Sequence, residues 1–468
     1  MIESKYLIFY IGSAICVPAG ILLASTSRRI HDAVFVALVL GVTQPASLFG
    51  LPTDINFLSR DWYRGTTRGI EISYLDLLAV ILLVSSLIMR RRDGFRLYWP
   101  PSLGFQISFL LWCCINVALF SQPKLFGIFE CTKIARAILL FAAVAMYIRR
   151  PREVRIFIWT LIGAVCYETV LSLLDRYAYG MHRIEGTLGH PNSLSMYCLQ
   201  CVPIFIAVFF AEGVGPRMRT ASVIAFLGAT ACVLFTISRM GVVALFLISA
   251  VAFLMCTGFR LSPRNAGLAI LGILLMTLML AKSWDTLSSR MQGTNLSEEY
   301  FTQEGDRGSY FRMGMPAIRD FPLSGMGLNN WSYWVTNRYA IEAGYETIEG
   351  GLPITPYPSL NEPPRGPTQA APAHNYYLIT VAELGWPGLS LVLAIFGRWL
   401  WISGQVLFMR NRDLMSRVRL GAFLSLWGIM LQSWTEWEFR QTSVYFNGHV
   451  ILAVAATLYY FRSPARRA

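Results

Sequence analysis

The sequence predicts an all-α polytopic membrane protein, and three of its properties are typical of that class. Thirteen apolar runs of roughly 18–22 residues alternate with short polar connections. Only 14% of the 468 residues are charged, whereas soluble domains carry about 25%. Arginine clusters occur at every second connection. These properties exclude a soluble enzyme, a disordered chain and a disulfide-stapled secreted domain.

Each apolar run is long enough to cross the roughly 30 Å hydrocarbon core of a bilayer as a helix. The first run also fits an interfacial or targeting segment, so the sequence predicts twelve or thirteen spans. In chain order the runs are 6–24, 33–50, 72–89, 102–120, 129–148, 156–173, 193–211, 220–238, 241–257, 266–282, 375–395, 420–435 and 447–461.

The arginine clusters predict the orientation of the chain. They begin with Arg28-Arg29, end with Arg466-Arg467, and all fall on one side of a chain with these spans. The positive-inside rule makes that side cytoplasmic, which places the C-terminus in the cytoplasm and, with thirteen spans, the N-terminus outside. Most of the net charge of +13 lies on that side. It therefore reflects membrane topology and does not indicate a nucleic acid partner.

One outer connection, residues 283–373, is much longer than the others and is rich in Tyr, Gly and Pro. Unpatterned connections longer than about 15 residues are usually functional or disordered, and the aromatic content favours a folded cap. We expect the functional site beneath it. The chain then divides into residues 1–173, 174–282, 283–373 and 374–468, which are N-terminal spans, central spans with polar loops, the cap and C-terminal spans.

The sequence offers no metal or cofactor motif. Nearly all nine cysteines lie in apolar stretches, and Cys198 and Cys201 have no second pair or nearby His to complete a zinc site. Phosphate-binding loops, dinucleotide-binding glycine patterns and nucleophile elbows are also absent from the sequence. We therefore predict no metal and no cofactor.

Two arginines near the outer ends of spans are candidates for function. Arg239 lies at the mouth of a tight helical hairpin, within Ser238-Arg239-Met240-Gly241. Arginine there either marks an anionic partner or anchors the span end by snorkelling. Arg312 precedes a glycine-rich turn, Pro322 to Gly327, that would let two backbones approach closely. Taken alone, Arg312 also fits a solvated loop charge.

Two histidines stand at the outer starts of spans. His374 precedes Asn375 and the run 375–395, where it would either titrate near neutral pH or serve as a structural helix cap. His190 belongs to a polar loop that runs from Arg183 to Asn192. In this loop Pro191 and Asn192 are typical of the first residues of a helix.

Four blocks of residues, in this order, resemble motifs of the bacterial O-antigen ligase/polymerase superfamily. The resemblance covers about residues 180–395, and the first 170 residues share only its hydropathy. The blocks are Arg183 to Asn192, Ser238-Arg239-x-Gly241, Arg312 with Pro322-Leu323-x-Gly325-x-Gly327, and His374-Asn375 followed by Gly385-x-x-Gly388.

The resemblance implies a metal-independent membrane glycosyltransferase of the GT-C-like class, in the bacterial inner membrane, with its active site facing the periplasm. Its donor would be a glycan on undecaprenyl diphosphate, transferred with inversion to an acceptor hydroxyl. By the same resemblance Arg239 and Arg312 would bind the diphosphate, as guanidinium groups match phosphate oxygens. His374 would be the general base or a third diphosphate ligand. Substrate-binding residues would be Arg183, His190, Asn192 and Asn375.

The resemblance leaves the acceptor open. An O-antigen or exopolysaccharide polymerase, an O-antigen ligase and a protein O-oligosaccharyltransferase would use a glycan, a lipid core and a protein, respectively. Other polysaccharide assembly proteins are expected partners. Outside this class, the sequence also admits a lipid-linked glycan flippase or transporter, or a structural membrane subunit. A flippase would be expected to carry its charges along the middle of several spans.

Overall fold

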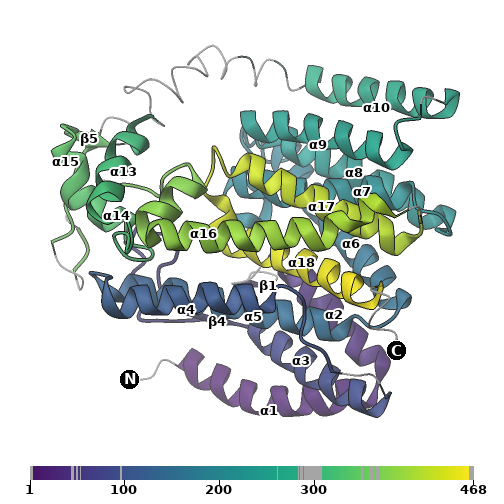
Figure 1. The fold of residues 1–468 in the computed structure, drawn as a ribbon, viewed down its shortest axis with the longest axis horizontal. Helices are drawn as coiled ribbons and strands as arrows, with labels where there is room; N and C mark the ends of the chain where they lie inside the picture. Colours follow the sequence, from purple (N-terminus) through teal and green to yellow (C-terminus); the bar gives the residue numbers. More distant parts are fainter. Residues whose placement is uncertain are drawn as a thin grey trace.

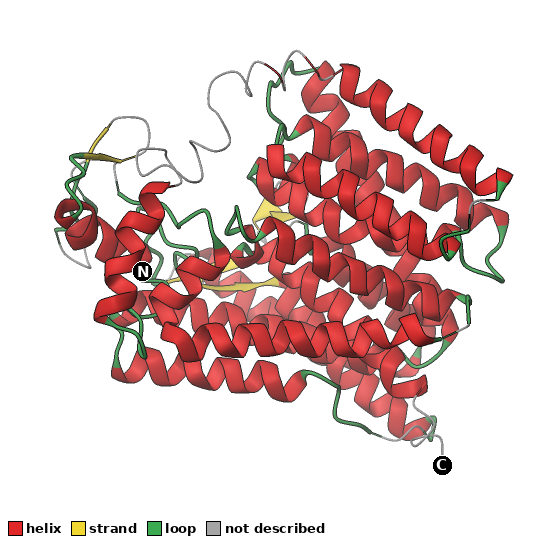
Figure 2. Ribbon diagram, turned by 45° about the horizontal axis from the view of Figure 1, so that its top comes forward, coloured by secondary structure: helices red, strands yellow, loops and turns green. Residues whose placement is uncertain are grey.

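The computed structural model describes residues 4–43, 47–48, 51–52, 54–94, 97–260, 262–282, 284, 288, 308–348, 352–358, 362–364, 369–409 and 411–462. This part of the chain is mostly helical, and its long helices lie roughly parallel in one bundle (Figure 1). A smaller group of short helices and loops projects beyond one end of the bundle (Figure 2).

Each of the thirteen predicted runs overlaps a helix. In chain order these helices are α1 (Ser4–Thr26), α2 (Arg28–Gly41), α3 (Tyr74–Arg92), α4 (Leu103–Leu119), α5 (Lys124–Tyr147), α6 (Pro151–Tyr177), α7 (Pro191–Phe209), α8 (Pro216–Phe235), α9 (Arg239–Thr257), α10 (Pro263–Lys282), α16 (Tyr376–Gly404), α17 (Leu414–Gln432) and α18 (Thr442–Arg462).

Among the described residues, eight helices are long and apolar enough to cross a membrane: α1, α6, α7, α8, α9, α16, α17 and α18. Helices α4 and α10 contain shorter apolar segments. The predicted span 33–50 is wrong in its second half, because α2 ends at Gly41 and Ser47–Leu48 is a strand. A 14-residue helix is about 21 Å long, which is less than the hydrocarbon core.

The sequence sets several helix boundaries. Helices α6, α7, α8 and α10 begin with proline, whose fixed φ and missing N–H suit the first helical position. Helix α9 ends before Gly258, which has a φ of 66° and caps the helix in the left-handed region. These boundaries place the polar loops at the ends of the bundle.

Helix α7 is the centre of the bundle. It packs against α8, α9 and α17, and nearly all of its apolar residues are buried. Helices α1 and α10 lie at opposite edges (Figure 1), and most of α1 is exposed. The core therefore forms around the central spans that carry the polar loops predicted from the sequence.

The all-α prediction misses three short antiparallel strand pairs among the described residues. In the longest pair, Asp54 lies opposite Ser73 and Phe57 lies opposite Ile70. The pairs are β1 (Ser47–Leu48) with β2 (Leu51–Pro52), β3 (Asp54–Phe57) with β4 (Ile70–Ser73), and β5 (Thr347–Ile348) with β6 (Leu352–Pro353).

The described part of the long segment 283–373 is folded, as its aromatic content predicts. It contains α13 (Gly308–Asp320), α14 (Trp331–Trp334), the π-helical turn η2 (Val335–Tyr339) and α15 (Ala340–Glu342). This group, here called the cap segment, has its own core around Tyr310, Met313 and Trp331, and packs against Leu378 and Ile379 of α16. Residues 289–307 lie outside the described residues.

Two glycine motifs join the cap segment to α16. Gly385, with a φ of 67°, interrupts α16, and Pro387 has no N–H for the carbonyl of Glu383. The cap segment supplies the missing donors: Met326 N donates to Ala382 O at 2.8 Å and Gly327 N to Glu383 O at 3.0 Å. A Cβ at Gly325 or at Gly385 would overlap the facing backbone. Glycine is therefore required on both sides of this contact.

Candidate functional site

His374 lies at the entrance to α16, beside a loop that approaches from the far end of the chain. Its Nδ1 is 2.8 Å from Glu436 Oε2, and its ring centroid lies 5.6 Å from that of Tyr310 in α13. About a quarter of the His374 side chain is exposed, whereas Glu436 is buried. The imidazole is thus held by a buried carboxylate and remains accessible.

The loop that carries Glu436 joins α17 to α18 and includes the short helix η4 (Glu438–Arg440). Sequence analysis missed it. Two residues after Glu436, Glu438 Oε1 lies 3.3 Å from His190 Nδ1. One loop therefore supplies a carboxylate to each of two histidines, which precede α7 and α16. The loop has three charged residues within Glu436–Arg440, between two apolar runs, and this was the available signal.

His190 is neutral near pH 7. Burial lowers its pKa to about 4; the charge of Glu436 opposes this shift, whereas those of Arg183 and His374 reinforce it. The contact with Glu438, 3.3 Å from Nδ1 to Oε1, is therefore one between a neutral imidazole and a buried carboxyl group. The side chain is 38% exposed, so His190 lines a surface that a ligand can reach.

Arg183 ties the loop before α7 to the turn before α9. Its Nε donates to Thr236 O at 3.1 Å, and its Nη2 donates to Asn192 Oδ1 at 3.0 Å. Ile184 N also donates to Phe235 O at 3.2 Å. These bonds bring the Arg183–Asn192 block beside the Ser238-Arg239 turn, as two loops predicted to share a site require.

Arg239 is the first residue of α9 and is partly exposed. The helix starts there because Ser238 Oγ accepts a hydrogen bond from Gly241 N at 3.3 Å. A Cβ at Gly241 would overlap Ser195 Oγ of α7. The glycine of the Ser-Arg-x-Gly block therefore allows the first turn of α9 to lie directly against α7.

Asn375 holds the start of α16 and the neighbouring loop together. Its Oδ1 accepts a hydrogen bond from Leu378 N at 2.9 Å and caps the helix, and its Nδ2 donates to Trp434 O at 2.9 Å. Asn192 is likewise buried and bonded to Arg183. The contacts shown by the structure for both predicted substrate-binding asparagines are therefore with the protein itself.

The N-terminal ends of three helices share this region. Ser195 of α7 touches Gly241 of α9, and Tyr376 N of α16 donates to Glu436 O at 3.2 Å, beside the loop that also contacts His190. Each helix N-terminus carries partial positive charge and N–H groups without intrahelical partners. The region is thus suited to an anionic group such as a phosphate.

Arg312 is placed differently from the other predicted site residues. It lies on the exposed face of α13, with its guanidinium carbon 5.9 Å from the ring centroid of Tyr345. Tyr310, which faces His374, precedes it by two positions, or roughly 200° around a helix. The structure therefore brings six predicted residues into one region and leaves Arg312 on another face of the cap segment; the six are Arg183, His190, Asn192, Arg239, His374 and Asn375.

A buried ionic cluster joins α5, α16 and the loop that carries Glu436. Arg440 Nη1 is 2.7 Å from Glu383 Oε2, and Arg440 Nε is 3.4 Å from Glu130 Oε1. Lys133 Nζ is 2.8 Å from Glu130 and donates to Arg440 O at 2.6 Å. All four side chains are at least 92% buried. Glu130, Lys133 and Glu383 are ionisable residues within predicted spans, and this was a signal that sequence analysis did not use.

Glu383 extends this cluster to the cap segment. Its carboxylate accepts hydrogen bonds from Asn329 N at 2.9 Å and from Trp331 N at 3.0 Å. One buried side chain therefore links α16, which begins beside His374, to both the Glu436 loop and the cap segment.

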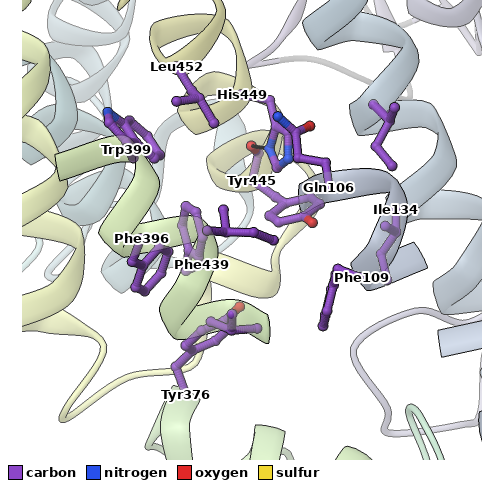
Figure 3. A pocket seen from close by; sticks show the side chains of 13 residues that line it. Gln106, Phe109, Ile134, Tyr376, Phe396, Trp399, Phe439, Tyr445, His449 and Leu452 are labelled. Carbon is purple, nitrogen blue, oxygen red and sulfur yellow. Dashed lines mark hydrogen bonds between the residues drawn. The ribbon is translucent and has the colours of Figure 1, made fainter. Parts of the chain in front are cut away.

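A small pocket lies between α4, α5, α16 and α18. Its lining is mainly aromatic and aliphatic and also includes Gln106, His449 and the tyrosines Tyr376 and Tyr445 (Figure 3). The lining contains no arginine or lysine, which a diphosphate would require. Among the described residues, no group of three His, Cys, Asp or Glu side chains is arranged to hold a metal ion. A metal-independent reaction remains a prediction.

Comparison with known families agrees with the motif analysis. The sequence profile of a family described as O-antigen ligase matches residues 224–393. This segment contains Arg239, Arg312 and His374 and the two glycine motifs that join the cap segment to α16. The predicted resemblance is therefore confirmed. No curated protein matches the chain.

Proposed function

Because the chain carries an O-antigen ligase domain at residues 224–393, we propose that it is a membrane glycosyltransferase of cell-surface polysaccharide assembly. Its donor is a glycan on undecaprenyl diphosphate, and its acceptor is a hydroxyl group. The reaction takes place on the periplasmic face, which is the side of His374 in the predicted orientation.

The contact between His374 and Glu436 carries this proposal. A carboxylate that accepts the Nδ1–H of a histidine fixes the ring and leaves Nε2 as a proton acceptor. His374 Nε2 takes the proton from the acceptor hydroxyl as its oxygen attacks the anomeric carbon. The bond from that carbon to the diphosphate breaks, and the configuration inverts. The Glu436 carboxylate stabilises the imidazolium that forms.

The leaving diphosphate needs positive charge and N–H donors. Arg239 and Arg183 supply guanidinium groups at the joined loops, and the starts of α7, α9 and α16 supply partial positive charge. His190 is neutral and acts as a hydrogen-bonding group. Arg312, which lies on the exposed face of the cap segment, contributes its positive charge to the diphosphate once substrate is bound.

The same site serves three acceptors, so polymerisation, ligation to a lipid core and transfer to protein differ only in what enters it. A flippase is the alternative outside the enzyme class. The four residues of the buried ionic cluster, Glu130, Lys133, Glu383 and Arg440, pair with one another. This pairing disfavours a charged transport path through them.

The test uses purified protein in detergent with a lipid-linked donor and candidate acceptors. New glycosidic product without a membrane barrier supports an enzyme, and no product with any acceptor contradicts the proposal. His374→Ala and Arg239→Ala should abolish product while the variants insert at normal levels. Arg217→Ala, in the exposed first turn of α8 at the other end of that helix, is the control. In a deletion strain, loss of long chains with single units retained indicates a polymerase, whereas accumulated long lipid-linked chains indicate a ligase.

A further inference from the structure

Four arginines converge on one carboxylate at the end of α3. Asp93 caps this helix. Its Oδ2 lies 3.1 Å from Arg28 Nη2, 3.3 Å from Arg149 Nη1 and 3.7 Å from Arg150 Nη2. Its Oδ1 lies 3.7 Å from Arg92 Nε. The arginines come from the start of α2, the end of α3 and the connection between α5 and α6, so folding assembles this group.

The arginines of this group, here called the Asp93 cluster, differ in burial. Arg149 is 3% exposed, whereas Arg28, Arg92 and Arg150 are 51%, 49% and 42% exposed. The buried guanidinium fixes the position of Asp93, and the three others form a rim that solutes and lipids can reach.

Positive charge exceeds negative charge in the Asp93 cluster. Glu153 is a second carboxylate, 3.9 Å from Arg149, so four guanidinium groups face two carboxylates. Nearby Arg152 pairs with Asp32 and leaves this balance unchanged. The excess is two positive charges. Each guanidinium carries N–H donors in a planar fork that fits phosphate oxygens.

Exposed apolar surface lies next to the Asp93 cluster. Leu22 and Leu23, one turn before the end of α1, are 65% and 51% exposed, and Ile88, one turn before Arg92, is 44% exposed. Helices α1 and α3 end close together at the edge of the bundle, at the end away from α13 (Figure 1). In a membrane, this edge faces lipid chains while the arginines reach the headgroup layer.

We propose that the Asp93 cluster is a binding site for the phosphate headgroup of an anionic glycerophospholipid, whose acyl chains lie along the exposed faces of α1 and α3. A lipid, unlike free phosphate, uses both the excess charge and the apolar surface beside it. The site lies at the opposite end of the bundle from His374 and does not depend on the proposed reaction.

The test measures phospholipid binding to the full chain in detergent, by native mass spectrometry at constant salt. Phosphatidylglycerol should be retained in preference to phosphatidylcholine. Arg28→Gln and Arg150→Gln should each weaken phosphatidylglycerol binding about fivefold, because one arginine near an anionic lipid surface contributes about 1 kcal/mol. Arg217→Gln removes an exposed charge at the same end of the bundle, outside the cluster, and should leave binding unchanged.

Three results would overturn the proposal: unchanged binding in both cluster variants, an equal loss in Arg217→Gln, or displacement of the lipid by excess inorganic phosphate. The last result would identify a site for free phosphate. If Arg28→Gln unfolds in a thermal scan without added lipid, Arg150→Gln and Arg92→Gln decide the question, since both side chains are on the exposed rim.

Discussion

His374 Nδ1 lies 2.8 Å from Glu436 Oε2, although 62 positions separate the two residues in the chain. The contact joins the entrance of α16 to the loop before α18 and gives the exposed imidazole a buried carboxylate partner. The same loop brings Glu438 to His190. The catalytic proposal therefore depends on a loop that none of the recognised motifs contains.

Replacing the carboxylate tests this relationship. Glu436→Gln should lower kcat for glycan transfer by about 100-fold, the lower end of what general acid–base catalysis contributes, because the amide cannot stabilise the imidazolium. Initial rates with saturating donor measure the effect. Glu342→Gln removes a carboxylate that pairs with Arg338 on the surface and is the control. A wild-type rate in Glu436→Gln would contradict the proposed role of the pair.

The contact between α9 and α7 can be tested with a double-mutant cycle. Gly241→Ala should lower transfer at least tenfold, because the added Cβ overlaps Ser195 Oγ and shifts the turn that carries Arg239. Ser195→Ala removes that oxygen, so the double variant should recover most of the activity. If the two changes are simply additive, the overlap is not the cause of the loss.

The two glycines that join the cap segment to α16 should tolerate no side chain. Gly325→Ala and Gly385→Ala each place a Cβ into facing backbone at a positive φ, which should detach the cap segment and abolish transfer. Limited proteolysis should then cut residues 308–348 faster than in the wild type. Gly397→Ala, in the same helix with open space around it, should behave like the wild type; equal proteolysis in all variants would refute the docking role.

The buried cluster should contribute strongly to stability. Glu383→Gln or Arg440→Ala should lower the free energy of unfolding by about 3–5 kcal/mol. Arg440→Ala leaves the buried Glu383 carboxylate without its cation, and Glu383→Gln leaves Arg440 and Lys133 with Glu130 as their one shared carboxylate in the cluster. Denaturant titration in detergent micelles measures this. Arg338→Ala breaks exposed ion pairs with Asp320 and Glu342 and should cost about 1 kcal/mol or less. Similar losses in the three variants would mean that the cluster is not buried as described.

The lowered pKa of His190 predicts a pH dependence of stability. Its pKa is about 4 in the folded protein and 6.5 in the reference state, so the unfolded chain binds the proton more readily between these values. Stability from this residue is therefore present above about pH 6.5 and lost as the pH falls toward 4. Because 38% of the side chain is exposed, the effect should be small.

The unfolding temperature should fall less between pH 7 and pH 4.5 in His190→Gln than in the wild type, since glutamine takes up no proton. Thermal scans in detergent at both pH values measure this. An identical fall in the two proteins would mean that His190 titrates normally in the folded state.

The sequence alone determined the helical, membrane-protein class, the positions of most spans and the family of residues 224–393. It could do so because bilayer thickness and helix rise fix the length of an apolar run, and because the four motif blocks are local in the chain. The same local reasoning extended the second predicted span, 33–50, beyond the end of α2 at Gly41. The apolar residues after Gly41, which include those of a strand, continue the apolar pattern of the helix.

Only the tertiary structure decided what surrounds His374. Glu436 and Glu438 reach the two histidines because α17 and α18 pack beside α7 and α16. Glu383 joins α16 to the Glu436 loop and to the cap segment. It can do so because the cap segment donates hydrogen bonds to the carbonyls of α16 that lack helical donors at the Gly385 interruption. Side-chain contacts across 62 positions depend on how helices pack, and hydropathy does not encode that packing. Conversely, Arg312 belongs to a motif by sequence, yet the direction of α13 turns it away from the residues gathered around His374.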